Sequence, residues 1–360
     1  MPLETYGIQT RQIQLNHPSF DAWVKSRMFD VVLFDRFLTE EQFSWRIREQ
    51  LPDCTLVLDT EDLHSLRHSR EKAVMEGRTW EAPAWLEDPM FYRELASILR
   101  CDLSLIISRA EMELLLSRLP FLREILHYLP FQFSKDQMET GPAFSARRDF
   151  VFVGNGKHRP NCDAIAWLKS ELWPLISERL PGTTLHIYGA YLPPDIRKLN
   201  APGEGFHVHG WAQSLGDVYK AHRLQLAPLR FGAGVKGKIL NALRFGLPTL
   251  STPVGWEGIY QGPEPAAFTA EDPSGFARQA AALYTDPAIW RQSLYAQLEA
   301  ATPHFSPFME PVLEAVENHK ERTRSLPESV RVLQKLLRNQ AFDRLKYFSK
   351  WIQAKQQHPN

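Results

Sequence analysis

Several features that would narrow the function are missing from this sequence. Lysine and arginine number 42, and aspartate and glutamate also number 42, so the 360-residue chain has no net charge. A balanced charge argues against broad nucleic-acid binding and against a polybasic membrane protein, although a local basic site remains possible. No stretch approaches the roughly 18 consecutive apolar residues of a membrane span. We therefore expect no transmembrane segment and no nucleic-acid partner.

Cysteine is also scarce. Cys54, Cys101 and Cys162 are widely spaced and odd in number, and no CxxC pair or His/Cys metal spacing accompanies them. We interpret them as reduced thiols. The opening residues contain no apolar stretch typical of a secretory signal. Both features predict a cytoplasmic protein.

Apolar residues make up 44% of the chain, and its length suits about two domains. Short apolar runs alternate with helix-length amphipathic segments such as 39–50 and 88–100. This alternation predicts an α/β fold of parallel sheets with helices on both faces. The predicted strands are 30–34, 55–59 and 103–108, followed by 150–155, 184–189, 206–210, 224–229 and 248–252.

The domain limits follow from these two series of strands. We expect a first domain over 1–131, a polar linker over 132–149, a second domain over 150–320 and terminal helices over 321–360. Before its first clear strand the chain offers only a weak strand at 10–15 and a short helix after Pro18. Doubly wound domains usually open with a strand, a glycine-rich turn and a helix, so the first domain is expected to lack this unit.

The first turn of the second domain, "VGNGKHRPN", combines glycines with basic residues. Gly154 and Gly156 permit a tight turn, and Asn161 is a good N-cap for the following helix. Lys157, His158 and Arg159 lie between them. A helix start and basic side chains together attract an anion, whereas the alternative is an ordinary turn with solvated charges.

A second turn, "LRFGAGVKGKILNALRFGLP", has the same character. Gly232 and Gly234 let the backbone approach a ligand, and the N–H groups of 233–237 can form an anion nest. Lys236 and Lys238 add positive charge. The sequence lacks GK[ST], so it is not a P-loop. A glycine-rich connection with solvent-facing lysines is the alternative.

A third turn places Gly210 and Trp211 after a predicted strand. They could receive a planar base, or Trp211 could be a core or rim aromatic. His207 and His209 alternate along that strand and share a face, but no further ligand residues lie nearby, so we expect no metal.

Residues 148–290, through the motifs "FVGNGKHRPN", "GWAQSLGDVYKAH" and "GAGVKGKILNALRFGLPTLSTPVGWEGI", resemble the donor-binding domain of GT-B glycosyltransferases of group 1, the family 4 kind. The first half is similar to the acceptor domain of that family, less specifically. The resemblance implies two Rossmann-like domains with an interdomain cleft and C-terminal helices that cross back to the first domain. It implies sugar transfer from a nucleotide diphosphate, with retention, without metal and with no cofactor beyond the UDP- or GDP-sugar.

The resemblance also implies roles for individual positions. Diphosphate binding falls on Gly154, Asn155, Arg159 (or Lys157), Gly232, Gly234, Lys236 and Lys238. Sugar contacts fall on Phe231, Ala233 and Glu257, although Glu257 could instead cap the next segment. Gly210 and Trp211 correspond to the base site, and Asn241 to the ribose site.

The sequence departs from this family at several positions. The family often has two glutamates eight positions apart, and here Ala233 and Asn241 stand in their place. Neutral Asn241 predicts a weaker hold on ribose. The family often has a histidine after the strand that reads "LVLDTED"; here the catalytic candidates are Glu61, Asp62 and His64, while capping of a helix is the alternative for the two acids.

Three functions remain open from the sequence. The first is a glycosyltransferase of hexosyl type, whose acceptor is an unknown glycan, lipid-linked sugar or protein. The second is a catalytically silent protein that binds nucleotide-sugar or acts as a scaffold. The third is a nucleotide-sugar epimerase, which would need several carboxylates in the cleft, where the second domain supplies few besides Glu257.

Overall fold

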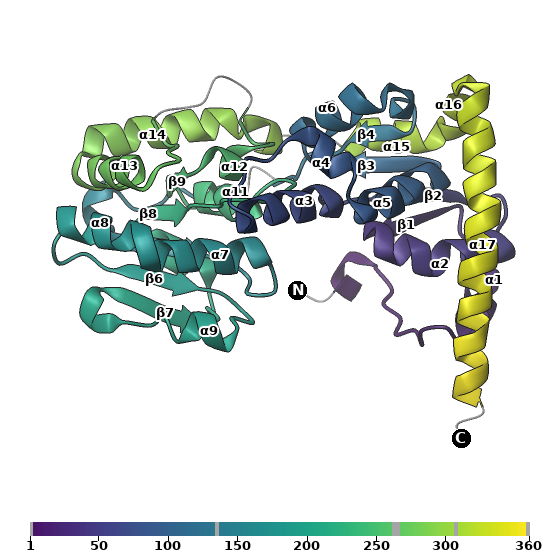
Figure 1. Cartoon of the computed structure of the whole chain (residues 1–360), viewed down its shortest axis with the longest axis horizontal. Helices are drawn as coiled ribbons and strands as arrows, with labels where there is room; N and C mark the ends of the chain where they lie inside the picture. Colours follow the sequence, from purple (N-terminus) through teal and green to yellow (C-terminus); the bar gives the residue numbers. More distant parts are fainter. Residues whose placement is uncertain (1–2, 134–136, 261–266, 306–308, 358–360) are drawn as a thin grey trace.

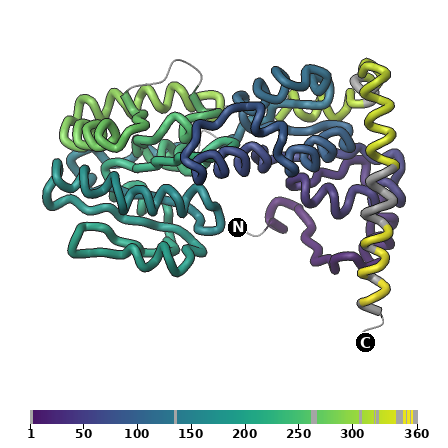
Figure 2. Tube along the Cα trace, in the orientation of Figure 1, coloured from purple at the N-terminus to yellow at the C-terminus, as the bar shows by residue number. Residues whose placement is uncertain are grey.

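Two parallel sheets, each covered by helices, lie side by side in the molecule (Figure 1). The computed structural model describes residues 3–133, 137–260, 267–305 and 309–357. The trace passes from the first sheet to the second and then returns to the first at its C-terminal end (Figure 2).

The first sheet has four parallel strands in the order β1-β2-β3-β4. They are β1 (Val31–Asp35), β2 (Thr55–Asp59), β3 (Leu103–Ile106) and β4 (Leu126–Tyr128). Three of them lie where the apolar runs predicted strands. The sequence did not predict β4, because three residues are too few to show a strand pattern.

Helices cover both faces of this sheet, and α3 reaches the second domain. The helices before the second sheet are α1 (Pro18–Arg27), α2 (Arg36–Gln50), α3 (His64–Met75), α4 (Ala82–Leu86), α5 (Pro89–Arg100) and α6 (Arg109–Arg118). The expected short helix after Pro18 is confirmed as α1. The expected strand over 10–15 is wrong, because these residues pair with no strand and only Ile13 packs against the core.

The second sheet has five parallel strands in the order β7-β6-β5-β8-β9. They are β5 (Arg148–Val153), β6 (Leu185–Tyr188), β7 (Phe206–Gly210), β8 (His222–Ala227) and β9 (Thr249–Ser251). The chain moves outward from β5 to β7 and then crosses to the other side of β5 at β8. The direction therefore reverses between β5 and β8, and the turns that follow these two strands meet at one crevice.

Alternate residues of β5 pack against different helices. Phe150 and Phe152 belong to the core under α7 (Arg159–Trp167), α8 (Trp173–Arg179) and α13 (Pro273–Thr285). Val151 and Val153 face α10 (Leu215–Ala221) and α11 (Gly237–Arg244). Helix α14 (Pro287–Ala300) follows α13, and the short helices are α9 (Pro194–Arg197) and α12 (Pro253–Trp256). Both faces of the sheet are thus covered, as parallel sheets require.

The C-terminal helices pack on the first domain. They are α15 (Met309–Glu317), α16 (His319–Ser325) and α17 (Glu328–Gln357). Val312 and Ala315 of α15 already pack against Val57 of β2, so the chain returns before residue 321, where the sequence placed the terminal helices.

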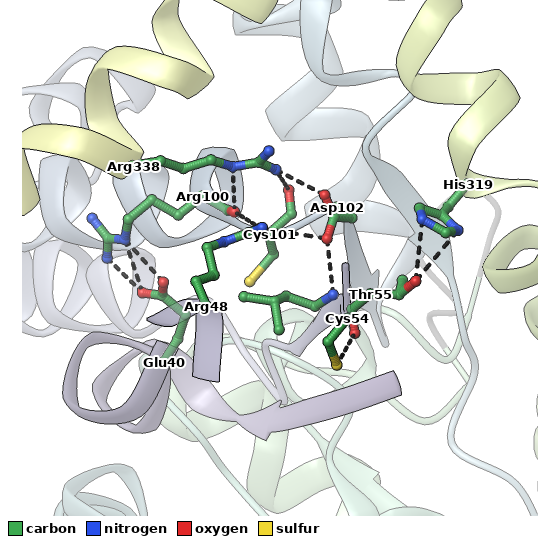
Figure 3. Close-up of polar contacts among 10 residues, drawn as sticks. Glu40, Arg48, Cys54, Thr55, Arg100, Cys101, Asp102, His319 and Arg338 are labelled. Atoms are coloured by element: carbon green, nitrogen blue, oxygen red, sulfur yellow. Dashed lines mark hydrogen bonds and ion pairs between the residues drawn. The ribbon is translucent and has the colours of Figure 1, made fainter. Parts of the chain in front are cut away.

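Asp102 fixes α17 to the first sheet (Figure 3). It accepts a hydrogen bond of 2.9 Å from Arg338 of α17 and one of 2.8 Å from the backbone N–H of Leu56.

Within the described residues, no helix is both long and apolar enough to cross a membrane.

Candidate functional site

A pocket of about 360 Å³ opens where the turn after β5 meets the loop after β8, which we call the β8–α11 loop (residues 228–236). Both the N-terminus of α7 and that of α11 border it. The first N–H groups of a helix lack intrahelical partners and carry partial positive charge, so two helix starts at one pocket favour an anionic ligand.

The pocket brings together nine of the residues to which the sequence analysis gave a role at the site, and His158 and Asn161 of the first turn line it as well. The nine are, from the second domain, Gly154, Asn155, Phe231, Gly232, Ala233, Lys236, Lys238 and Asn241, and Asp62 comes from the first domain. The remaining candidates do not line it: Glu61, His64, Lys157, Arg159, Gly210, Trp211, Gly234 and Glu257.

Gly154 is required by close packing at the first turn. A Cβ atom there would lie 2.8 Å from both Asn161 Cγ and a ring carbon of Phe152. The expected N-cap role of Asn161 is wrong, because α7 begins at Arg159 and His158 occupies the cap position. Instead the Asn161 side chain donates to the carbonyl of Asn155 at 2.9 Å and accepts from Lys238 Nζ. It thereby joins the two turns.

Lys238 is the cation that this packing places inside the pocket. Burial and the nearby charge of Lys236 lower the pKa of Lys238 to about 7. At this pKa the ammonium is readily deprotonated, and a phosphate beside it would favour the charged form. Lys238 is therefore suited to respond to an anion.

Lys236, which lines the pocket, also belongs to an ion cluster with Glu257, which lies behind the pocket wall. Lys236 Nζ donates to the Gly234 carbonyl at 3.0 Å and lies 3.8 Å from a Glu257 oxygen. Arg70 of α3 forms two hydrogen bonds with Glu257, of 2.6 and 2.7 Å, and a third of 2.9 Å with the Gly232 carbonyl. Burial opposes ionisation of Glu257, but the bonds from Arg70 and the charge of Lys236 outweigh it and lower the pKa.

This cluster gives Glu257 a role different from either one expected from the sequence. Because both of its oxygens bind Arg70, it clamps the two domains together rather than lining the pocket.

The catalytic candidates of the first domain are arranged around Asp62. His64 Nε2 lies 3.2 Å from one Asp62 oxygen, and Arg67 is ion-paired with the other. Burial opposes ionisation of Asp62, but His64 and Arg67 together lower its pKa. Glu61 has a backbone φ of 59° and lies outside the pocket, and burial together with Asp59 raises its pKa. Asp62 alone of the three faces the pocket.

Arg159 does not share the pocket with Lys238. Its side chain is 76% exposed and is ion-paired with Glu71 of α3, beside a separate hollow. The structure therefore does not bring these two cations to one pocket, and the role of Arg159 at a diphosphate stays a prediction. Arg67 and Lys236 are the cations that join Lys238 at the pocket.

Gly210 and Trp211 lie away from the pocket as well, and Trp211 is 70% exposed. The side chain of Asn241 lines the pocket but is engaged within its helix. Its amide donates to the Gly237 carbonyl at 2.9 Å, and its oxygen accepts from Arg244 at 3.1 Å. Ribose binding by Asn241 would require these bonds to be exchanged.

Sequence reasoning missed three residues of the first domain: Arg67, Arg70 and Glu111. Glu111 of α6 is buried, and its Oε1 accepts hydrogen bonds from Gly234 N (2.7 Å) and Leu63 N (3.2 Å). Arg67 and Arg70 carry a local signal, since they are spaced three apart on the helix that follows "LVLDTED". Glu111 carries none, because it resembles an ordinary first-turn acid of a helix.

Among the described residues, no group of three or more His, Cys, Asp and Glu side chains is arranged to hold a metal ion. His207 and His209 do share a face, as expected, and their rings stack with that of His186.

Comparisons with known proteins agree with this architecture. Residues 147–286 match the family described as "Glycosyl transferases group 1". No curated protein matches the sequence. The predicted fold class, two Rossmann-like domains of the GT-B type with C-terminal helices, is confirmed by solved glycosyltransferase structures.

Three solved structures illustrate the likeness. Anabaena HepE, solved with UDP, is 13% identical with a TM-score of 0.61, over 90% of this chain and 88% of that one. TarM is 11% identical (TM-score 0.60), over 83% of this chain and 57% of its own. Pneumococcal GtfA, an O-GlcNAc transferase solved with UDP and GlcNAc, is 15% identical (TM-score 0.57), over 84% of this chain and 58% of its own.

At these identities the structural likeness concerns the fold, and the chain spans under three fifths of the length of TarM and GtfA. The family match covers the domain that supplies most of the pocket. Together, these comparisons show that residues 147–286 are similar to group 1 glycosyltransferases and that the chain has the fold of GT-B glycosyltransferases.

Proposed function

We propose that this protein transfers a hexose-type sugar from a nucleotide diphosphate to an acceptor, and that the pocket beside Lys238 holds the diphosphate. One observation carries the proposal: two helix starts and the side chains of Arg67, Lys236 and Lys238 converge on one pocket between the domains. HepE and GtfA, which share the fold, were solved with UDP. The second domain, 150–320, would hold the donor, and the first, 1–131, would receive the acceptor.

The proposed chemistry depends on charge stabilisation. When the bond between the anomeric carbon and the diphosphate oxygen breaks, negative charge builds up on the leaving phosphate. Preorganised N–H groups and cations aimed at this charge stabilise the transition state more than the ground state. Lys238 and the N-termini of α7 and α11 would provide this stabilisation, with no metal and no cofactor other than the donor.

Asp62 is proposed to act on the acceptor side of the pocket. Its carboxylate is held ionised by His64 and Arg67, and the residue lines the pocket beside Gly234 of the β8–α11 loop. An ionised carboxylate can accept a hydrogen bond from an acceptor hydroxyl and orient it. Retention of configuration is proposed from the family resemblance. The three free cysteines support the cytoplasm as the compartment.

The test is a screen of UDP- and GDP-sugars for protection against thermal unfolding, followed by detection of released nucleotide diphosphate with candidate acceptors. We expect at least one donor to stabilise the protein, and Lys238→Ala to remove both the stabilisation and the turnover. Absence of binding by every donor would exclude the proposal.

A catalytically silent nucleotide-sugar-binding protein is the second candidate. The observation that favours it is the engagement of Asn241 with Gly237 and Arg244, which leaves its amide occupied. Donor binding without any hydrolysis or transfer would support this candidate, whereas turnover that depends on Lys238 would exclude it. The engagement of Glu257 with Arg70 speaks against an epimerase, since it leaves that carboxylate outside the pocket.

A further inference from the structure

The long terminal helix α17 presents an apolar face that no other described element covers. Tyr347 is 67% exposed, Phe348 59% and Trp351 54%, and Leu333 and Leu336 of the same helix are also exposed. We call these five residues the α17 face. Single exposed apolar residues are common on proteins, but three neighbouring exposed aromatics are not.

The first half of α17 accounts for its attachment to the protein. Val330 and Gln334 are buried, and Arg338 binds Asp102 and the carbonyl of Arg100 (Figure 3). These contacts lie in the first half of a helix of 30 residues. In Figure 1 the C-terminal end of α17 extends beyond the other elements of the first domain. The aromatic half therefore leaves the domain as a projecting helix.

The members of the α17 face lie along one side of the helix. Tyr347 and Trp351 are four residues apart, and at 3.6 residues per turn they align with Leu333 and Leu336. The rings of Phe348 and Trp351 stack with their centroids 6.0 Å apart. Lys355 Nζ lies 4.2 Å from the centre of the Trp351 ring. An aromatic surface bordered by lysine is thus continuous over the last turns.

Charge distinguishes this helix from the rest of the molecule. The chain as a whole is neutral, yet residues 328–357 contain seven lysines and arginines against two acids, Glu328 and Asp343. The basic side chains on the exposed surface include Arg331, Lys335, Lys350 and Lys355. The net charge of this one helix is +5.

We propose that the α17 face binds the surface of a bilayer that contains anionic phospholipids, with the helix lying parallel to the membrane plane. Tyrosine and tryptophan favour the lipid–water interface, and lysines beside them can reach the headgroups while their stems cover apolar surface. Amphipathic helices with aromatic and basic faces bind membranes in this way. A second copy of the chain fits less well, because it would bring two helices of like charge together.

The inference goes beyond sugar transfer, since it concerns where the protein works and is independent of the donor. Its test is flotation of the full chain with vesicles of two parts phosphatidylcholine and one part phosphatidylglycerol, beside vesicles of phosphatidylcholine alone. We expect binding to the anionic vesicles that weakens as salt rises, because screening reduces the attraction of the lysines.

Two variants separate the apolar and the electrostatic contribution. Tyr347→Ala/Phe348→Ala/Trp351→Ala removes the aromatic surface, and Lys350→Glu/Lys355→Glu reverses two charges. Each is expected to reduce vesicle binding by at least about tenfold. The matched controls are Tyr295→Ala and Lys198→Glu, exposed positions of the second domain, which are expected to bind as the unchanged protein does. Thermal unfolding checks that every variant folds.

Three results would overturn the proposal. One is failure of the folded protein to float with anionic vesicles. Another is binding that both variants retain. The third is a dimer in solution that the aromatic variant dissociates, which would assign the α17 face to a second copy of the chain.

Discussion

Glu111 Oε1 accepts a hydrogen bond of 2.7 Å from the backbone N–H of Gly234, so a buried acid of the first domain holds the β8–α11 loop of the second. Gly234 has a φ of 64°, and a Cβ there would lie 2.8 Å from the Asp62 Cβ, so only glycine permits this approach. Burial, and then the charge of Asp62, raises the pKa of Glu111 to about 8. The strength of the contact between the two domains is therefore linked to the protonation of Glu111.

Replacing Glu111 by glutamine should imitate the protonated acid. Glu111→Ala should destabilise the protein by about 2–4 kcal/mol, since it leaves two buried N–H groups without an acceptor. Glu111→Gln keeps an acceptor oxygen and should lose less than about 1 kcal/mol at pH 6. Urea unfolding measures both. Equal losses for the two variants would show that the acceptor oxygen is unimportant.

The pH dependence of the same variants provides an independent check. Because the folded-state pKa of Glu111 is raised, its contribution to stability is complete below its unfolded value and is lost as pH rises through about 8. The stability of the unchanged protein should therefore decline toward pH 9 relative to that of Glu111→Gln. A constant difference between pH 6 and pH 9 would contradict this linkage.

Nucleotide binding should depend on the protonation of Lys238. Because its pKa is lowered to about 7, this lysine must take up a proton to bind a phosphate at higher pH. We expect UDP affinity to fall as pH rises above 7. Because UDP itself is already fully ionised above about pH 7, this fall would report the loss of the proton from Lys238. Calorimetry in buffers of different ionisation enthalpy would detect the proton uptake. Lys238→Arg should bind without this dependence, because arginine stays charged.

Arg67 and Arg159 both lie at the domain boundary, and substituting each in turn tests which of them binds the diphosphate. Arg67 lines the pocket, whereas Arg159 is exposed and paired with Glu71 outside it. Loss of a charge-assisted bond costs about 1.5–3 kcal/mol, so Arg67→Ala should weaken UDP binding roughly tenfold to a hundredfold. Arg159→Ala should change it less than about threefold. If Arg159→Ala weakened UDP binding more than Arg67→Ala did, Arg159 and not Arg67 would be assigned to the diphosphate site.

Acid should destabilise the second domain through its stacked histidines. His186 Nδ1 and His209 Nε2 are 2.8 Å apart, so one ring must be neutral to accept from the other. Burial, followed by the charges of His222 and His209, lowers the pKa of His186 to about 4. A depressed histidine pKa means that stability is complete above the unfolded value of about 6.5 and declines as pH falls toward 4.

The melting temperature should therefore drop between pH 7.5 and pH 5, and His186→Gln should reduce this drop. If the variant and the unchanged protein lose the same number of degrees, the histidine stack does not cause the acid sensitivity.

Much of the fold could be predicted from local patterns. All eight apolar runs interpreted as strands overlap strands β1–β3 and β5–β9. Ile165, Leu168, Leu172 and Ile176 recur at helical spacing in the sequence, and all four are fully buried. These features are legible because a strand or a helix must bury its apolar side wherever it packs. The segment 10–15 lacks such a constraint, since its side chains remain mostly exposed.

The candidate site was only partly predictable. The sequence by itself determined that glycines, lysines and helix starts would follow β5 and β8, because strand ends and glycine turns are local properties. Only the tertiary structure decided which side chains face the pocket. Arg159 turns to Glu71, Glu257 to Arg70 and Gly234 to Glu111, and all three partners lie in the other domain. The direction of a long or charged side chain depends on the nearest opposite charge or hydrogen-bond partner, and contacts between domains distant in sequence determine where that partner lies.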